Sequence, residues 1–459
     1  MYHRDGLRQL FAVPRRNFAL QTRSKLVVIF VVSAIAAASV WFYFDRILVA
    51  RQVVDAIAHD RPRGNLSDLY PRWLGARDLL VHGRNPYSDE LTLEIQEGYY
   101  GRRLDAARPN DPKDQQGFAY PVYVVFLLAP LLRLPFHQVQ ILFHWLLVGL
   151  TAASILWWLR ALHWRVAGLA MASAAVLTVG SVPAVQGIKL QQLSLLVAGL
   201  LAGSAACLAS GFLFFGGLLL ALATIKPQLA CFPGAWFLVW AVSDWRGRRK
   251  FLFGLALAMA LLLAGSEAVL PGWMRLFLGA IQQYHRYTQN RSVLDQLLPG
   301  IFTGKIVAAL AVALAAVFLW RLRNVAADSA QFGRAIALVM ATTVLVVPMY
   351  APYNQVLLLP AILLLVRDRR KMAFSASRGV RFVYAAGAFT LSWQWIASLG
   401  LSAVYLISPD AALSGWKWPF FATFALPVLV FALTIVDVQS SLRSSLLAGH
   451  EGDGSQKHD

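Results

Sequence analysis

The chain has 459 residues, of which 58% are hydrophobic and 14% are charged, whereas soluble domains contain roughly 45–50% apolar and about 25% charged residues. A soluble protein of this size cannot bury so much apolar surface. The composition therefore excludes a soluble enzyme, a disordered protein and a nucleic-acid binder. The net charge of +19 comes from basic residues that lie between long apolar runs, which is the pattern expected of membrane proteins. Cys207 and Cys231 both lie in apolar segments and fit neither a disulfide framework nor a metal cluster.

The first apolar run covers residues 26–44 and follows a basic segment, residues 1–25, which we expect in the cytoplasm. A cleaved signal peptide is the alternative, because small residues lie near Ala36. The run is longer than the roughly 7–15 apolar residues of a signal peptide, and it ends in the aromatic residues 41–44, which suit a membrane interface. We therefore predict an uncleaved anchor.

The one long hydrophilic segment, residues 45–118, comes next and carries over half of the acidic residues. The rest of the chain is a series of apolar blocks, and a helix needs roughly 20 apolar residues to cross a bilayer. We predict an all-α polytopic membrane protein with a transmembrane domain over residues 26–438 and a polar cytoplasmic tail over 439–459. The further predicted spans are 137–158, 166–184, 191–209, 211–225, 227–243, 251–270, 301–320, 333–350, 353–366, 380–404 and 419–436.

The linkers between these blocks alternate in charge. One set, together with the N-terminus, holds about three times as many Lys and Arg residues as the other set. Since cytoplasmic loops are rich in Lys and Arg, both termini should be cytoplasmic, and the 45–118 loop should lie on the periplasmic face of the plasma membrane. Residues 120–135 are apolar but would invert every later loop if they spanned. We expect them to be re-entrant or interfacial.

Two lysines, Lys189 and Lys226, lie in the linkers that should face outward, and both have glutamines nearby. A lysine that extends its amine to the membrane interface is the plain alternative. Ionisable groups at a shared cavity are nevertheless functional candidates in membrane proteins. Two lysines on the side that should be poor in lysine favour a functional role.

The most informative part of the long loop is residues 67–90. Residues 73–81 have helical spacing, Gly83 ends the predicted helix, and residues 85–87 form a turn. Asp68 would lie at the N-terminal end of this helix, which we expect to lie on the membrane. Its carboxylate would then be either a simple helix cap or a catalytic group.

These segments resemble glycosyltransferase family 87, whose members are polyprenyl-phosphate-sugar-dependent enzymes of the GT-C fold and include α-mannosyltransferases. The similar motifs keep one order over residues 68–360. They are Asp68-Leu-Tyr70, Ala76-Arg77, Leu80, Gly83 and Asn85-Pro-Tyr87; Phe118-Ala-Tyr-Pro121; Gln186 and Gln191-Gln192-Leu-Ser194; Lys226-Pro227; and Pro352-Tyr-Asn354 with Leu359-Pro360.

The resemblance implies a GT-C-like bundle of about twelve transmembrane helices, with interfacial helices in the long first outer loop. It places the catalytic aspartate in that loop, at Asp68. The chain departs from the family pattern because Tyr70 follows Asp68 by only two residues, and because residues 353–355 stand where histidine is often found. The implied contacts to donor phosphate or substrate are Lys226, Lys189, Arg72, Gln191, Tyr120 and Asn354.

The implied activity is transfer of a mannose-like hexose or a pentose from a polyprenyl-phosphate donor to a glycolipid or glycan acceptor. A base must take the proton of the acceptor hydroxyl, one-sided displacement inverts the anomeric carbon, and cations stabilise the departing phosphate. Neither a metal nor another cofactor is required. The alternatives are a transporter or lipid flippase, or a non-catalytic subunit of an envelope-polysaccharide complex, but transporters often contain repeated halves and none is evident here.

Overall fold

The computed structural model describes residues 15–64, 67–288, 291–300, 302–348 and 350–454. All regular structure in these ranges is helical, as predicted. Part of the expected cytoplasmic N-terminus, residues 1–14, and the end of the expected tail, residues 455–459, lie outside them. The helices are α1 (Arg15–Phe42), η1 (Tyr43–Leu48), α2 (Val49–Ala58), α3 (Tyr70–His82), α4 (Asp89–Tyr100), α5 (Val124–Leu128), η2 (Ala129–Leu131), α6 (Phe136–Ala161), α7 (Gly168–Val179), α8 (Val182–Lys189), α9 (Leu193–Ala209), α10 (Leu213–Ala223), α11 (Pro227–Val242), α12 (Trp245–Val269), α13 (Trp273–Thr288), α14 (Val293–Leu297), α15 (Thr303–Arg321), α16 (Ala330–Val346), η3 (Pro352–Leu358), α17 (Leu359–Arg367), α18 (Arg369–Ala373), α19 (Arg378–Ile407), α20 (Pro409–Ser414), η4 (Trp418–Phe420) and α21 (Ala425–Gly454).

Six helices of the described chain are long and apolar enough to cross a membrane, or seven if the bent pair α7–α8 counts as one span. The predicted number of about twelve is therefore not confirmed. Several predicted spans, such as α10 and α11, are apolar helices of 10–17 residues, and 17 residues extend only about 26 Å against a hydrocarbon core of roughly 30 Å. These short helices pack inside the bundle, where most residues of α9 and α16 are buried.

The first membrane helix is longer than predicted. It continues from α1 through the π-helical η1 into α2, so that one candidate span covers Arg23–Ala58. The boundary predicted at residue 44 therefore falls inside a helix. The C-terminal boundary predicted at residue 438 also falls inside a helix, α21.

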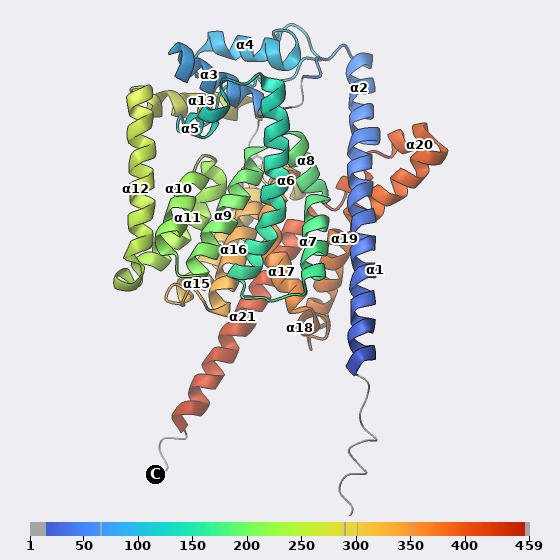
Figure 1. Ribbon diagram of the computed structural model, residues 1–459, viewed down its shortest axis with the longest axis vertical. Coiled ribbons are helices and arrows are strands. Elements are labelled where there is room, and N and C mark those ends of the chain that lie inside the picture. Colours follow the sequence, from blue (N-terminus) through green and yellow to red (C-terminus); the bar gives the residue numbers. More distant parts are fainter. Residues whose placement is uncertain (1–14, 65–66, 289–290, 301, 349, 455–459) are drawn as a thin grey trace, which may run out of the picture.

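The two ends of the molecule differ in what they carry (Figure 1). Helices α2, α3, α4, α5 and α13 gather at the upper end, whereas the start of α1, α18 and the end of α21 lie at the lower end. Residues 120–135 form only α5 and η2 near the upper end and do not cross the bundle. Both ends of the described chain thus lie opposite α3 and α4 of the 45–118 loop, and the side of the membrane that each end faces stays a prediction.

Arginine side chains connect the basic linkers at the lower end through hydrogen bonds. Arg248 at the start of α12 donates to the backbone oxygens of Trp240 and of residues 323–325, at 2.5–3.1 Å. Arg367 donates to the backbone oxygen of Leu162 at 2.9 Å. Linkers that the charge pattern assigns to one side are therefore in contact with one another.

The buried carboxylate of Asp437 connects α21 to α16 and α18 at this end. Asp437 of α21 is fully buried and accepts from Arg334 of α16 at 2.8 Å and from Lys371 of α18 at 3.0 Å. Arg334 also lies 3.3 Å from Asp368. Each cation has a carboxylate partner here, as burial of charge requires.

Many large apolar side chains face outward on the long helices. Val28 on α1, Phe253 and Leu261 on α12, and Leu310 on α15 are each more than half exposed. In water such a surface would cause association. In a bilayer it contacts lipid, which explains why the hydrophobic share of the chain is so high.

Helices α10 and α12 pack closely because a glycine lies on each side of the contact. A Cβ atom on Gly217 would lie 2.2 Å from the backbone oxygen of Phe251, and one on Gly254 would lie 2.2 Å from that of Phe214. Small residues permit such close backbone approach between membrane helices.

We predict that Gly254→Ala destabilises the protein by about 1–3 kcal/mol, because the added methyl forces the two backbones apart. The matched control is Gly149→Ala, since a Cβ on Gly149 meets nothing within 4 Å. Thermal unfolding in detergent measures both. Equal stability of the two variants would contradict the close packing of α10 on α12.

Candidate active site

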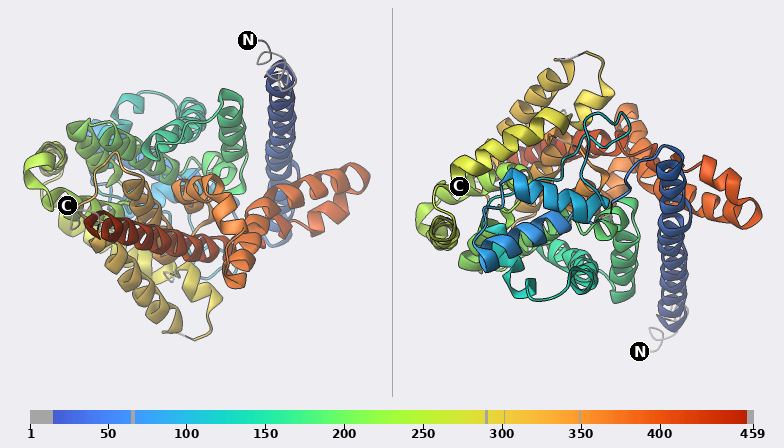
Figure 2. Two further views of the ribbon diagram at one scale, coloured as in Figure 1. Left: turned by 90° about the horizontal axis from the view of Figure 1, so that it is seen from below. Right: turned by 90° about the horizontal axis from the view of Figure 1, so that it is seen from above.

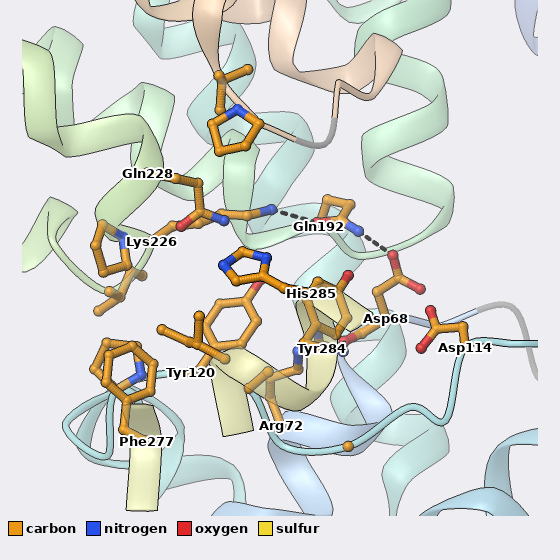
Figure 3. A pocket seen from close by; sticks show the side chains of 18 of the residues that line it. Asp68, Arg72, Asp114, Tyr120, Gln192, Lys226, Gln228, Phe277, Tyr284 and His285 are labelled. Atoms are coloured by element: carbon orange, nitrogen blue, oxygen red, sulfur yellow. Dashed lines mark hydrogen bonds between the residues drawn. The ribbon is translucent and has the colours of Figure 1, made fainter. Parts of the chain in front are cut away.

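A cavity of about 390 Å³ lies at the upper end, within the usual size range of small-molecule sites. Segments far apart in the chain form its walls (Figure 3). Its polar lining includes Asp68, Arg72, Asp114, Gln192, Lys226, Tyr284 and Asn354. Its apolar lining includes Ile225, Pro227, Phe277, Ile281 and Val347.

Asp68 places its carboxylate in this cavity rather than on the helix that follows. The N-cap of α3 is Leu69, and no side chain caps the helix, so the simple capping role is wrong for Asp68. The Asp68 carboxylate instead accepts from the Gln192 side-chain amide and from the Tyr99 hydroxyl, the latter at 3.4 Å. The Asp68 backbone N–H donates to the backbone oxygen of Leu190 at 2.9 Å. This hydrogen bond holds the loop against the turn between α8 and α9.

Burial raises the pKa of Asp68, while the positive charges of Arg72 and Lys226 and the hydrogen bonds from Gln192 and Tyr99 oppose the rise. A carboxylate with a raised pKa is a better proton acceptor than an ordinary aspartate. The surroundings of Asp68 therefore suit a general base.

Gln192 connects Asp68 to Lys226 (Figure 3). Its amide nitrogen donates to Asp68, and its amide oxygen accepts from the Lys226 ammonium at 3.1 Å. The Lys226 ammonium also donates to the Ser194 hydroxyl at 2.6 Å. The Gln192 side chain thus lies between the Asp68 carboxylate and the Lys226 ammonium and is hydrogen-bonded to both.

Lys226 is buried, with only 7% of its surface exposed. Its hydrogen-bond acceptors in the described chain are the neutral oxygens of Gln192 and Ser194, and it forms no ion pair there. Pro227 at the first position of α11 fixes the helix start and leaves the lysine at the upper helix end. A buried cation without a carboxylate partner is available for an anionic ligand.

Arg72 and Asn354 have unused hydrogen-bonding atoms at the cavity. The Arg72 guanidinium donates to the Asp68 backbone oxygen at 2.7 Å and lies 4.6 Å from the centre of the Tyr120 ring. The Nε atom of Arg72 and the Oδ1 atom of Asn354 are buried and have no hydrogen-bond partner among the described residues. These two groups and Tyr120, all predicted from the sequence, reach the cavity.

The structure does not bring Lys189 or Gln191 to the cavity lining. Lys189 pairs with Asp45 and lies over the Trp41 ring at 5.3 Å. The Gln191 side chain donates to the backbone oxygens of Ile188 and Lys189 at 3.1 and 3.0 Å. Lys189 is at the last turn of α8, on the side that faces the first membrane helix, and Gln191 stabilises the turn.

Asp78, on α3, forms its ion pairs outside the cavity. It contacts His82 at 3.0 Å and Arg84 at 3.0 Å and does not line the cavity. Asp114, which the sequence analysis did not single out, does line it. Burial raises the pKa of Asp114, and Gln116 donates to both of its carboxylate oxygens at 3.0 Å.

Helix α13 contributes cavity residues that the sequence analysis also missed. Phe277, Ile281, Tyr284 and His285 lie on one helical face and line the cavity. Their spacing of four, three and one residues is the signal that could have identified this face. His285 supplies a histidine to a site whose 353–355 segment has none.

No group of three or more His, Cys, Asp or Glu side chains that could hold a metal ion occurs in the part of the chain that the structure describes. The cavity lining supplies two carboxylates, Asp68 and Asp114, together with two cations, a histidine, amide groups and phenols. This set can accept a proton and bind a phosphate.

A comparison with protein families matches residues 118–348, half of the chain, to the model of glycosyltransferase family 87. The chain belongs to glycosyltransferase family 87. The transporter or flippase interpretation is not favoured by this result. The matched range contains Tyr120, Gln192, Lys226 and Tyr284, while Asp68 lies before it. No curated protein and no solved structure matches the chain.

We predict that Lys226→Met raises the pKa of Asp68 further, because the substitution removes a positive charge that favours the carboxylate. The carboxyl band of Asp68 in infrared difference spectra against Asp68→Asn, followed with pH, measures the shift. Lys189→Met is the control, since Lys189 pairs with Asp45. An unchanged pKa in Lys226→Met would show that the two charges are not coupled.

Proposed function

We propose that this glycosyltransferase moves a sugar from a polyprenyl-phosphate donor to an outer-face glycolipid or glycan, with inversion and with Asp68 as the base. The observation that carries the proposal is the Asp68–Gln192–Lys226 arrangement, in which a buried carboxylate and a buried cation line one cavity. Such a cavity suits a reaction that needs a proton acceptor and a phosphate site.

In the proposed reaction, the Asp68 carboxylate and the Lys226 ammonium act on different atoms of the substrates. The acceptor oxygen attacks the anomeric carbon and gives its proton to the Asp68 carboxylate. The bond between the anomeric carbon and the phosphate oxygen breaks, and its electron pair leaves with the polyprenyl phosphate. A positioned base typically contributes about 10²–10⁴-fold in rate, and displacement from one side inverts the sugar.

Lys226 and Arg72 are the proposed phosphate partners. The leaving phosphate gains negative charge as the glycosidic bond breaks, and fixed donors in a water-poor cavity stabilise that charge strongly. Asn354 lines the cavity and is the proposed partner of a sugar hydroxyl. Gln192 keeps Lys226 from closing directly onto Asp68, so both groups stay available.

The apolar side of the cavity supports a lipid-linked donor. Pro227, Phe277 and Val347 line it together with the polar groups, and the cavity lies at the end of the bundle that carries α3, α4 and α13. From the charge pattern we place this end on the periplasmic face of the plasma membrane, with the termini in the cytoplasm.

We predict that Asp68→Asn lowers sugar transfer by about 10²–10⁴-fold, because the amide cannot accept the proton. The amide keeps the size of the side chain, so binding of the lipid donor should persist. Transfer of radiolabelled sugar from a synthetic polyprenyl-phosphate donor measures the rate, and donor binding is measured on the same preparation.

Asp78→Asn is the matched control, because Asp78 lies on α3 but pairs with His82 and Arg84 away from the cavity. Its transfer rate should stay within a few-fold of the unmodified protein. Near-normal transfer by Asp68→Asn, with loss in Asp114→Asn, would instead assign the base to Asp114.

A further inference from the structure

A second cavity of about 320 Å³ lies next to the first, between α4, α13 and the chain that connects α4 to α5. In the view from above in Figure 2, α13 lies beside α3 and α4. Asp89 and Thr92 of α4 line one wall, and Gln283 and Arg286 of α13 line the opposite wall. Its size falls in the range of ligand sites.

The two cavities share one wall, residues 114–119. Asp114 and Gln116 line the first cavity, Gln115 lines the second, and Gly117 and Ala119 line both. Phe118 also lines the second cavity. A ligand in the second cavity therefore lies just across this segment from the site that contains Asp68.

Three exposed polar side chains of the second cavity have no partner among the described residues. The side chains of Asp89, Gln283 and Arg286 make no hydrogen bond or ion pair within the described ranges. Asp89 of α4 offers a carboxylate acceptor, and Gln283 and Arg286 of α13 offer an amide and a planar guanidinium donor to the same cavity. Groups of this kind pair well with neighbouring sugar hydroxyls.

The aromatic part of the wall is rigid. Tyr87 donates its hydroxyl to the Tyr120 backbone oxygen at 2.6 Å, and its ring meets Phe118 edge to face at 5.3 Å. Phe118 in turn packs on Gly75, where a Cβ would lie only 2.4 Å from the Phe118 ring. The second cavity thus combines fixed aromatic rings with unpaired polar groups.

We infer that the second cavity binds the acceptor glycan, holding the sugar next to the one that reacts. This inference rests on the proposed function. The acceptor is then a glycan of at least two sugars: the terminal sugar presents its hydroxyl to Asp68, and the penultimate sugar contacts Asp89, Gln283 and Arg286. A single sugar would lose these contacts and react more slowly.

The experiment compares octyl monoglycosides with octyl diglycosides of mannose, glucose, galactose and arabinose, with a synthetic polyprenyl-phosphate sugar as donor. For the sugar that is accepted, kcat/KM should be at least about tenfold higher for the diglycoside, since each retained hydrogen bond contributes about 0.5–1.5 kcal/mol. Equal use of both acceptors would overturn the inference.

Two variants test the location. Arg286→Ala removes one polar contact of the second cavity, and Arg286 does not line the first cavity. Gln283→Ala removes one polar contact, and Gln282→Ala, beside it on α13 but outside both linings, is the control. Arg286→Ala and Gln283→Ala should each reduce the ratio of diglycoside to monoglycoside kcat/KM several-fold, and Gln282→Ala should leave that ratio unchanged.

The outcomes separate the two proposals. Transfer by the unmodified protein, with the diglycoside preference intact in both Arg286→Ala and Gln283→Ala, rejects the second cavity as the acceptor site and leaves the proposed function standing. Absence of transfer to every glycoside rejects the proposed function and this inference with it. Thermal unfolding of each variant confirms that the comparison is made on folded protein.

Discussion

The buried ammonium of Lys226 is the interaction on which the site depends. Removing a charge from water is costly unless partners replace the water, and here the described partners are the oxygens of Gln192 and Ser194. The nearest negative charge in this network, Asp68, is held on the far side of Gln192. The cavity is thus organised around a buried cation that makes no direct contact with a carboxylate of the described chain, a condition that favours an anionic substrate.

The lower end of the molecule shows the opposite arrangement. There Arg334 and Lys371 both contact the buried Asp437, so their charges are balanced within the protein. That balance suits a structural role, joining α16, α18 and α21. Of these two networks, the one around Lys226 is therefore the one whose buried cation has no carboxylate contact among the described residues.

Part of this arrangement was predictable from sequence. The apolar runs predicted an all-helical membrane protein, and Gly83, in a left-handed conformation with φ of 68°, ends α3 as expected. The number of spans was not predictable in this way, because apolar runs that form short helices inside a bundle have the same composition as those that contact lipid. Only length and packing in three dimensions distinguish α10 from α12.

The candidate active site was likewise predictable only in part. Arg72, Tyr120, Lys226 and Asn354 were selected from local motifs, and the structure brings all of them to one cavity with Asp68. Lys189 was selected by the same reasoning, but the direction of its side chain depends on how α8 packs against the first helix. Asp114 lies in a polar loop that carries no periodic signal, so its approach to Asp68 results from tertiary folding alone.

The most direct test of the central claim is a structure determined with a non-transferable donor, such as a polyprenyl phosphonate sugar. We predict that its phosphonate binds within hydrogen-bonding distance of Lys226 and Arg72, with the anomeric carbon facing Asp68 and the lipid chain leaving past Phe277 and Val347. A phosphonate bound away from Lys226, with the Gln192–Lys226 contact unchanged, would contradict the assignment of this cavity as the donor site.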